Sequence, residues 1–328
     1  MRTFVTGAAG FIGSTLVDRL LADGHQVVGI DNLSTGNAAN LDHAFRYNAL
    51  SPRRFTFVRI DILAPELVDI VEGTNPDVIF HLAAQVDVQV SVNDPQFDAR
   101  SNVLGTINLC EASRRSGVRR IVYAASAGSR CGAPQFLPVR EISHVDALSP
   151  CAAAKLAGEL YLRAYAEMYG LAPICLALEN VYGPRQTPHG VAGEIAILSS
   201  AMITGQPLTV SGDGASAYDF VYVDDVVEAF VRAGCAPIET TGTFNVGTGQ
   251  HTTVSEVHEL ISAVLDGPMP PQFAMDRGDE LDAIALNVTE AERELGWKPT
   301  VDIAEGVQRT IRWLCATLEP EPSALVGT

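Results

Sequence analysis

The sequence predicts an α/β fold built on a doubly wound parallel sheet. Apolar runs that are typical of buried strands alternate with amphipathic, helix-like stretches through the first two-thirds of the chain. Strands that alternate with helices in this way are typical of a parallel sheet covered on both faces. A glycine-rich turn follows the first apolar run, where such folds pass from strand to helix.

The elements follow one another in a regular order along the first part of the chain. The expected strands are residues 2–7, 26–31, 55–61, 77–83, 120–126 and 172–178. The helices expected between them cover residues 11–23, 64–72, 97–116 and 151–169.

The pattern becomes less regular after about residue 177, which predicts a second, smaller lobe. We expect residues 1–177 to form a Rossmann domain, to which a segment of about 218–248 returns. Residues 178–328 would then form mainly a C-terminal substrate lobe, and the last ~10 residues are expected to be disordered.

Composition excludes several classes of protein. The chain has 328 residues, 47% of them hydrophobic and 19% charged, as in ordinary soluble globular proteins. Its net charge of −17 argues against a nucleic-acid partner, although one small anion could bind in a locally positive pocket. No uninterrupted apolar stretch is long enough to predict a membrane span.

The cysteines are scattered through the chain without the C-x-x-C spacing of a metal site. This distribution predicts reduced thiols and a cytoplasmic protein with neither a disulfide framework nor a bound metal. The six positions are Cys110, Cys131, Cys151, Cys175, Cys235 and Cys315.

The first strand-to-helix turn carries the pattern of a dinucleotide site. Gly7 permits a tight turn, Gly10 lets the backbone approach a pyrophosphate, and Gly13 lets the helix pack closely on the strand. Asp31 ends the second strand, where a carboxylate accepts from the ribose hydroxyls and repels a 2′-phosphate. Asp61 ends the third strand, where it would meet the adenine. These residues predict NAD rather than NADP.

At this point the chain resembles a known family. The segments "TGAAGFIG", "DNLSTG", "HLAAQVDVQVS", "NVLGT", "NVYGPRQ" and "FNVGTG" are similar to those of the extended short-chain dehydrogenase/reductases. The branch resembled most is that of UDP-glucose 4-epimerase-like enzymes. The resemblance implies a nucleoside-diphosphate sugar in the C-terminal lobe. It also implies a homodimer formed through two long helices per subunit, here 97–116 and 151–169.

The resemblance further implies an internal redox reaction on tightly held NAD. In the family a tyrosine phenolate takes a proton from a sugar hydroxyl while the sugar carbon gives hydride to NAD. A lysine lowers the pKa of that tyrosine, and a Ser or Thr hydrogen-bonds the reacting oxygen. The keto sugar then turns over and takes the hydride back on its other face.

Carried over residue by residue, the resemblance assigns a cofactor set and a substrate set. The expected NAD contacts are Gly7, Gly10, Phe11, Ile12, Gly13, Asp31, Asn32, Asp61, Ile62, Leu82, Ala83, Ala84 and Lys155. The expected substrate contacts are Gln85, Arg130, Asn180, Tyr218 and Arg277.

Tyr218 stands where the family has an arginine for the sugar diphosphate, whereas Arg277 matches the second phosphate-binding arginine. Arg130 would replace the missing arginine or occupy a solvated surface position.

The sequence departs from the family at the residues that would react. Cys151, four residues before Lys155, replaces the tyrosine. Ala127 occupies the usual hydroxyl position between Ser126 and Ser129, and Cys131 replaces a second tyrosine of that motif. We expect Ser126 or Ser129 to supply the hydroxyl.

Cys151 leaves three possibilities open. Its thiol has a lower intrinsic pKa than a phenol and would ionise easily beside Lys155 and oxidised nicotinamide, but its sulfur stops short of a tyrosine oxygen by about an aromatic ring. It therefore acts through a bridging group such as water, or the base lies elsewhere, or redox activity is lost. Glu179 would serve as a base, read sugar hydroxyls, or be structural. His81 and His189 are expected to be structural and solvated, respectively, rather than catalytic.

The leading prediction is NAD-dependent epimerisation of a nucleoside-diphosphate sugar with a non-standard proton-transfer group. The changes cluster in the substrate half, which favours an unusual sugar such as one from antibiotic or surface-polysaccharide synthesis. A 4,6-dehydratase would need an acid pair where this chain has Ala127, Gly128 and Ser129. The sequence also leaves open a decarboxylase and a redox-inactive family member that binds NAD and sugar.

Overall fold

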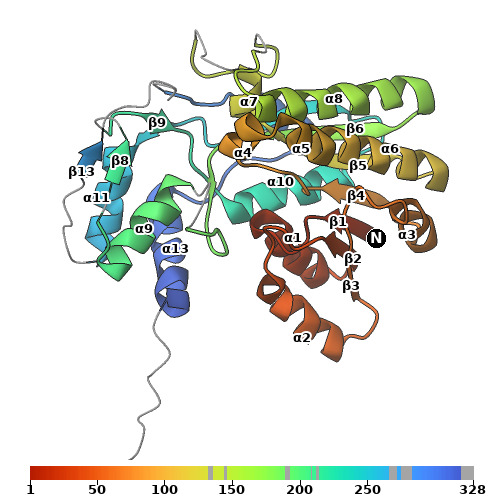
Figure 1. Ribbon diagram of the computed structural model, residues 1–328, viewed down its shortest axis with the longest axis horizontal. Helices are drawn as coiled ribbons and strands as arrows, with labels where there is room; N and C mark the ends of the chain where they lie inside the picture. Colours follow the sequence, from red (N-terminus) through yellow and green to blue (C-terminus); the bar gives the residue numbers. More distant parts are fainter. Residues whose placement is uncertain are drawn as a thin grey trace, which may run out of the picture.

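Seven parallel strands form the central sheet of the protein, shown by a computed structural model (Figure 1). Their order is β11-β6-β5-β4-β1-β2-β3. The strands are β1 (Arg2–Thr6), β2 (Gln26–Asp31), β3 (Phe55–Arg59), β4 (Val78–His81), β5 (Arg120–Ser126), β6 (Ala172–Leu178) and β11 (Gly242–Val246). The structure describes residues 1–131, 136–143, 146–188, 193–207, 209–211, 214–265, 272–274 and 283–318.

Helices cover both faces of this sheet (Figure 1). On one face lie α1 (Phe11–Ala22), the 3₁₀ turn η1 (Ala38–Leu41), α2 (Asp42–Leu50) and α10 (Val223–Cys235). On the other face lie α3 (Leu67–Thr74), α4 (Val88–Asn93), α5 (Pro95–Ala99), the π-helical turn η2 (Arg100–Leu104), α6 (Gly105–Ser116) and α8 (Pro150–Tyr169). The predicted α/β fold with a doubly wound parallel sheet is therefore confirmed.

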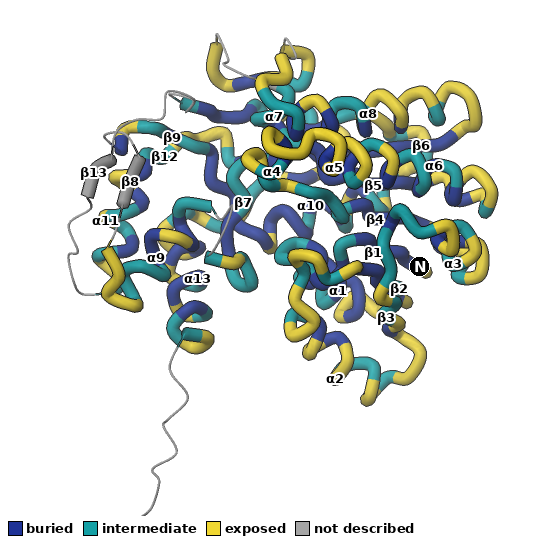
Figure 2. Tube along the Cα trace, in the orientation of Figure 1, coloured by how far each residue is buried: buried dark blue, intermediate teal, exposed yellow. Residues whose placement is uncertain are grey.

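The strands are mainly apolar, and the central ones are buried, because helices cover both faces of the sheet (Figure 2). All residues of β6 are buried, and so are all residues of β5 except its last, Ser126. On the face of α3 and α6, Phe4 and Ile121 pack in one apolar core. On the other face, a core that includes Phe80 and Phe230 continues into the C-terminal part of the chain.

That C-terminal part forms a smaller body beside the carboxyl ends of the strands. Its helices α9 (Glu194–Thr204), α11 (Val254–Leu265) and α13 (Ile303–Leu318) pack on one another, while α12 (Thr289–Leu295) packs on β11. Its short strands pair as β7 (Val181–Tyr182) with β10 (Val221–Tyr222), β9 (Ala217–Tyr218) with β12 (Thr252–Thr253), and β8 (Thr209–Ser211) with β13 (Gln272–Ala274).

β11 and α10 belong to the sheet layer although in sequence they lie between segments of this body. β11 pairs with β6 in parallel, and α10 packs against α1. The short helix α7 (Ala127–Cys131) leads away from β5. No helix in the described ranges is long and apolar enough to cross a membrane. The predicted disordered end falls on residues 319–328, which lie outside the described residues.

The expected helix 97–116 is wrong as a single helix. The chain forms α5 and then α6, joined by the π-helical turn η2. Asn102 lies in this turn and uses its side chain to bond the backbone of Gln85, which the sequence pattern does not reveal. π-helical turns are frequent next to functional sites, and this one borders the carboxyl edge of the sheet.

Candidate active site

The glycine turn after β1 is packed too closely to accept side chains. Gly7 has a φ of +70°, and a Cβ there would lie 2.8 Å from the backbone nitrogen of Ala83. A Cβ on Gly13 would lie 2.0 Å from the carbonyl oxygen of Gly7. Gly10 precedes α1, and no side chain caps this helix end. The first turn of α1, with Phe11 and Ile12, is therefore suited to face a pyrophosphate.

Two carboxylates follow the neighbouring strands on the same edge. Asp31 accepts from the backbone nitrogens of Ala9 at 3.0 Å and Leu33 at 2.8 Å, which fixes it beside the glycine turn. Asp61 accepts from the Asn32 amide at 2.7 Å. The predicted ribose and adenine residues are thus brought together, and with the glycine cradle they fit NAD.

The loop after β4 closes the other side of this cradle. Thr6 Oγ1 accepts from the backbone nitrogens of Leu82 at 3.2 Å and Ala83 at 3.1 Å. His81 lies fully buried between the hydroxyls of Thr6 at 2.8 Å and Thr106 at 3.1 Å. Burial lowers the pKa of His81 to about 3, so the ring is neutral and serves the packing of the loop, as expected.

Lys155 is fixed beneath the carboxyl ends of the central strands. Its Nζ donates to the carbonyl oxygen of Ala124 at 3.0 Å and lies 5.2 Å from the centre of the Tyr123 ring. Burial lowers its pKa, while Cys151 and Asp98 act in the opposite direction. The lysine thus points at the edge where the nicotinamide ribose is expected.

Cys151 lies one helical turn before Lys155 on the same face of α8 and is 8% exposed. Burial raises the pKa of its thiol, and Asp98 and Asp87 raise it further against the opposing effect of Lys155. The protein's own groups therefore disfavour ionisation of this thiol, contrary to the expectation that it ionises easily.

Asp98 is a buried carboxylate that the sequence predictions missed. It accepts from the side-chain amides of Gln85 at 2.9 Å and Asn102 at 3.0 Å. Burial raises its pKa. The signal available in the sequence was the spacing of Asp98 and Asn102, which places both on one face of a helix.

The side chain of Gln85, a predicted substrate contact, is hydrogen-bonded within the protein. Its amide nitrogen donates to Asp98 and to the carbonyl oxygen of Asp87, and its amide oxygen accepts from the backbone nitrogen of Asp87. These contacts shape the loop after β4, and a contact of Gln85 with the substrate stays a prediction.

The hydroxyl motif lies at the end of β5, beside the end of β6. Ser126 is opposite Leu178 in the strand register, and its Oγ accepts from the backbone nitrogen of Ser129 at 3.2 Å. Glu179 follows directly after Leu178. Its carboxyl accepts from the backbone nitrogen of Gly128. Three predicted groups, Ser126, Ser129 and Glu179, are thereby brought together.

Glu179 lies in an environment that favours its neutral form. Burial raises its pKa to about 8, with further contributions from the charges of Asp219 and Glu194, against the opposing Gly128 hydrogen bond. Asp219 is itself fully buried and accepts from the backbone nitrogens of Thr248, Gly249 and Leu286. The sequence did not predict Asp219 or Asp98 as residues of the site.

The predicted substrate residues Tyr218 and Asn180 flank this corner. The Tyr218 ring lies edge-on to Phe220, with ring centres 5.9 Å apart, and packs against an apolar cluster that contains Ala127. The backbone carbonyl of Asn180 accepts from Val221 at 3.0 Å, which places Asn180 where β7 begins.

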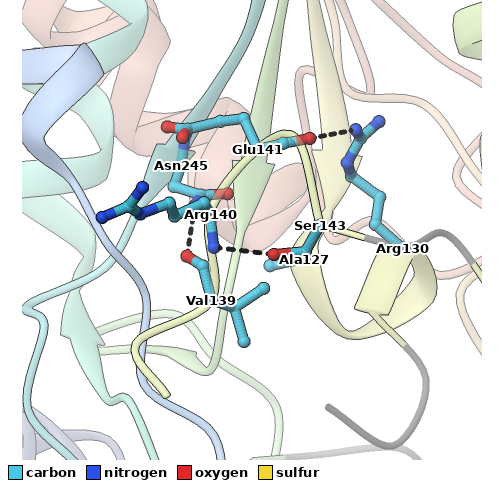
Figure 3. Close-up of a pocket in the computed structure, with 7 residues that line it drawn as sticks. All are labelled: Ala127, Arg130, Val139, Arg140, Glu141, Ser143 and Asn245. Atoms are coloured by element: carbon cyan, nitrogen blue, oxygen red, sulfur yellow. Dashed lines mark hydrogen bonds between the residues drawn. The ribbon is translucent and has the colours of Figure 1, made fainter. Parts of the chain in front are cut away.

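The guanidinium of Arg130, a predicted substrate contact, is engaged within the protein. It forms an ion pair with Glu159 of α8. It also donates to the carbonyl oxygen of Glu141 at 3.0 Å (Figure 3). Arg130 lines a cavity of about 10 Å³ with Ala127 and Asn245, and this volume holds at most one water. These contacts give the arginine a structural role, and its contact with the sugar diphosphate stays a prediction.

Three of the predicted positions cannot be placed. Arg277 and His189 lie outside the described residues, and for Cys131 only the helical backbone is described.

Comparisons with known proteins agree with this arrangement. The sequence profile of the NAD dependent epimerase/dehydratase family matches residues 3–247. The chain is 49% identical to a "UDP-glucose 4-epimerase" of Mycolicibacterium smegmatis over 95% of this chain and 98% of that protein.

Solved structures are similar over nearly the whole chain. A UDP-glucose 4-epimerase of Thermotoga maritima with UDP-glucose has a TM-score of 0.90 and 36% identity, covering 97% of this chain and 100% of its own. A UDP-glucose 4-epimerase of Thermus thermophilus in complex with NAD has a TM-score of 0.85 and 37% identity, covering 96% and 99%. The chain belongs to the NAD-dependent epimerase/dehydratase family.

Proposed function

We propose that the protein interconverts UDP-hexoses that differ in configuration at C4, through NAD that stays bound during the cycle. The observation that carries this proposal is the convergence of Lys155, Ser126 and Glu179 at the carboxyl ends of β5 and β6, beside an intact NAD cradle. The UDP-glucose 4-epimerases that resemble the chain over 95% or more of its length support the choice of reaction and nucleotide.

A bound NAD would supply the hydride acceptor and donor for the sugar carbon. The glycine turn and Asp31 would hold the cofactor, and the NAD preference would follow from the negative charge of Asp31. Lys155, whose ammonium is anchored on Ala124, would hold the nicotinamide ribose. Ser126 hydrogen-bonds the reacting oxygen, with Ser129 fixing its orientation.

We also propose that Cys151 occupies the position of the family's tyrosine. The substitution leaves room for about one aromatic ring between its sulfur and the sugar. With Ala127 and Tyr218, it defines a substrate half that suits an unusual UDP-sugar of the kind used in antibiotic or surface-polysaccharide synthesis. Asn180, Tyr218 and Arg277 are proposed to contact the nucleotide sugar, mainly from residues 178–328, while residues 1–177 and about 218–248 hold NAD.

We propose a homodimer formed by the outer faces of α8 and of the segment made by α5, η2 and α6. These faces expose large apolar side chains, among them Phe97, Leu104, Leu160 and Met168, which are 42%, 49%, 64% and 67% exposed. Exposed apolar residues gathered on adjacent helices are typical of protein interfaces. A cytoplasmic location is supported by the free thiols of Cys110, Cys151, Cys175, Cys235 and Cys315.

The test is a transient-absorbance experiment on the purified protein. UDP-glucose, UDP-galactose and their N-acetyl and uronic acid forms are added in turn, and the reduced-nicotinamide band is followed together with product formation. We expect a transient rise of the band and formation of the C4 epimer. Binding of these sugars without any reduction would support a redox-inactive protein, and elimination or loss of carbon dioxide would indicate a dehydratase or decarboxylase.

A further inference from the structure

We propose that the carboxylate of Glu179 is the proton-transfer group of this enzyme, taking the proton of the reacting sugar hydroxyl and returning it after the sugar has turned over. This inference rests on the proposed function. It names the proton-transfer group, which is left unassigned because the family's tyrosine is absent. It follows from the position of Glu179 just after β6, from the groups around its carboxyl, and from the surroundings of Cys151.

The sheet places Glu179 where the chemistry is expected. Leu178 is the last residue of β6 and pairs with Ser126, the last residue of β5. Glu179 is therefore the first residue beyond the carboxyl edge, next to the serine hydroxyl. Lys155 reaches the same edge from α8 through its bond to Ala124, two residues before Ser126. Ligands of open α/β sheets bind at this edge.

The side chain of Glu179 reaches the turn that follows β5. Its Oε2 would lie 3.8 Å from a Cβ on Gly128, and the backbone nitrogen of Gly128 donates to the carboxyl. Gly128 lies between Ala127 and Ser129, the positions around the family's hydroxyl group. The carboxyl thus lies beside the turn in which Ala127 takes the place of the family's hydroxyl residue.

The neighbouring charges suit a group that exchanges a proton near neutral pH. Burial raises the pKa of Glu179 to about 8, and the carboxylates of Asp219 and Glu194 also raise it. Asp219 comes from the segment between β9 and β10, and Glu194 from the start of α9. A general base works best when its pKa is close to the working pH.

Cys151 has the less suitable surroundings for this role. Burial, Asp98 and Asp87 raise the pKa of its thiol, and Lys155 only partly offsets them. Its sulfur is also attached directly to Cβ, two bonds short of the reach of a glutamate carboxyl. The thiol therefore remains protonated and lies beside Lys155 on the same face of α8.

The proposed step balances in atoms and charge. The sugar O–H bond breaks and its proton forms a new O–H bond on Glu179. The C–H electron pair leaves as hydride to the oxidised nicotinamide, and the carbon becomes a carbonyl. The reverse step returns the hydride to the other face of the carbonyl and the Glu179 proton to the oxygen, so the enzyme ends in its starting state.

The first experiment measures the oxidation half-reaction in the NAD-loaded protein. Glu179→Gln keeps the size of the side chain and removes its ability to take a proton. We expect the rate of nicotinamide reduction to fall by about 100-fold or more, as for loss of a general base. Binding of UDP-sugar should change by less than about fivefold, because proton transfer rather than affinity is removed. Glu179→Asp should restore part of the rate.

The pH profile and the cysteine variant separate the two rival bases. In the wild type the rate should rise with pH and level off above about 8, where the carboxylate is ionised. Glu179→Gln should lack this rise. Cys151→Ala should keep the rise and lose less than about tenfold in rate, because the thiol is not the base. Glu259→Gln, an exposed glutamate on α11, is the matched control and should behave as the wild type.

The second experiment needs neither substrate nor turnover. Between pH 4.5 and about 8 the folded protein keeps the Glu179 proton that the unfolded chain has lost. The stability contributed by the protonated group therefore declines as pH rises through this window. The thermal midpoint of the wild type should fall relative to that of Glu179→Gln, whereas Glu259→Gln should follow the wild type.

The outcomes distinguish this inference from the proposed function. A wild type that turns over a UDP-sugar, with Glu179→Gln equally fast, would overturn the role of Glu179 alone. Loss of reduction in Cys151→Ala with full activity in Glu179→Gln would assign the base to the thiol. Parallel thermal curves would also count against a buried, proton-holding carboxyl. A wild type that reduces no nicotinamide with any UDP-sugar would overturn both proposals.

Discussion

At the scale of single residues, Asp31 combines a structural contact with a recognition contact. It holds the backbone nitrogens of Ala9 and Leu33, which fixes the glycine turn against the end of β2. The same carboxylate is placed to accept from the ribose hydroxyls of NAD and to repel the phosphate of NADP. We therefore predict that the preference for NAD depends on the charge of Asp31, whereas the shape of the turn depends on its hydrogen bonds.

Asp31→Asn should separate these two contributions. The amide oxygen still accepts one backbone hydrogen bond, but the charge is lost. We expect NAD to bind about 5- to 150-fold more weakly, which corresponds to about 1–3 kcal/mol for a charge-assisted hydrogen bond, and the preference over NADP to fall by at least about tenfold. Calorimetric titration of the cofactor-free protein with NAD and NADP measures both effects.

Asp61→Asn is the matched control for this prediction. Asp61 binds Asn32 and the backbone nitrogen of Leu63 near the expected adenine, away from the ribose 2′ position. Asp61→Asn should weaken the binding of NAD and the binding of NADP by similar factors. An unchanged NAD to NADP ratio in Asp31→Asn would contradict the assigned role of its charge.

The local geometry around the predicted cofactor residues could be predicted from the sequence, whereas the partners of two predicted substrate residues could not. Gly7, Gly13 and Asp31 act through backbone geometry and local turns, which short motifs encode. The sequence did not reveal the partners of Gln85 and Arg130, because these partners, Asp98 and Glu159, lie 13 and 29 residues away along the chain. Such pairings are set by tertiary packing, for which a single sequence carries no signal.

At the scale of elements, continuous apolar runs were the most reliable signal. The expected strands 120–126 and 172–178 match β5 and β6 residue for residue, because a strand buried on both faces forms a nearly continuous apolar run. The expected helix 97–116 did not reveal its π-helical turn. Within this turn the Asn102 side chain binds the backbone of Gln85, which lies outside the helix.

The close packing of α1 on the glycine turn after β1 can be tested by a substitution at Gly13. A Cβ added at Gly13 would lie 2.0 Å from the Gly7 oxygen, so Gly13→Ala must push α1 away from the strand. We expect a loss of at least about 2 kcal/mol in the free energy of unfolding, at the level of severe overpacking, with loss of NAD binding. Urea denaturation and NAD titration measure the two effects.

Gly73→Ala is the control, because a Cβ at this position in α3 meets nothing within 4 Å. Alanine is the better helix former, so this variant should be as stable as the wild type or up to about 1 kcal/mol more stable. Equal stabilities of the two alanine variants would mean that close packing of α1 on the turn contributes little.

At the scale of the whole molecule, one apolar core joins the two parts of the chain. It runs from Val5 and Phe230 of the sheet layer to Val257 and Ile311 of the second body. This continuity holds the carboxyl edge, with Lys155 and Glu179, at a fixed place relative to Tyr218 and Asn180. The face of the sheet that is turned away from α1 and α10 is covered by α5, η2, α6 and α8. This group of helices carries the exposed apolar residues proposed for the dimer.

Leu160→Glu tests that face. Leu160 is 64% exposed on α8, and burying a leucine contributes about 1.5–3 kcal/mol, whereas a carboxylate buried without a partner costs several kcal/mol. In a symmetric dimer each change acts twice. We therefore expect dissociation to monomers at micromolar concentration, measured by analytical ultracentrifugation, with the far-UV circular dichroism unchanged because the side chain does not contribute to the core.

Leu50→Glu separates loss of an interface from loss of surface hydrophobicity. Leu50 is 87% exposed at the end of α2, on the other side of the sheet from α8. The same substitution there removes as large an apolar group and adds the same charge, so a dimer formed through α5, α6 and α8 should persist. Dissociation by both variants would point to a general effect of charge, and a dimer that survives only Leu160→Glu would place the interface near α2 instead.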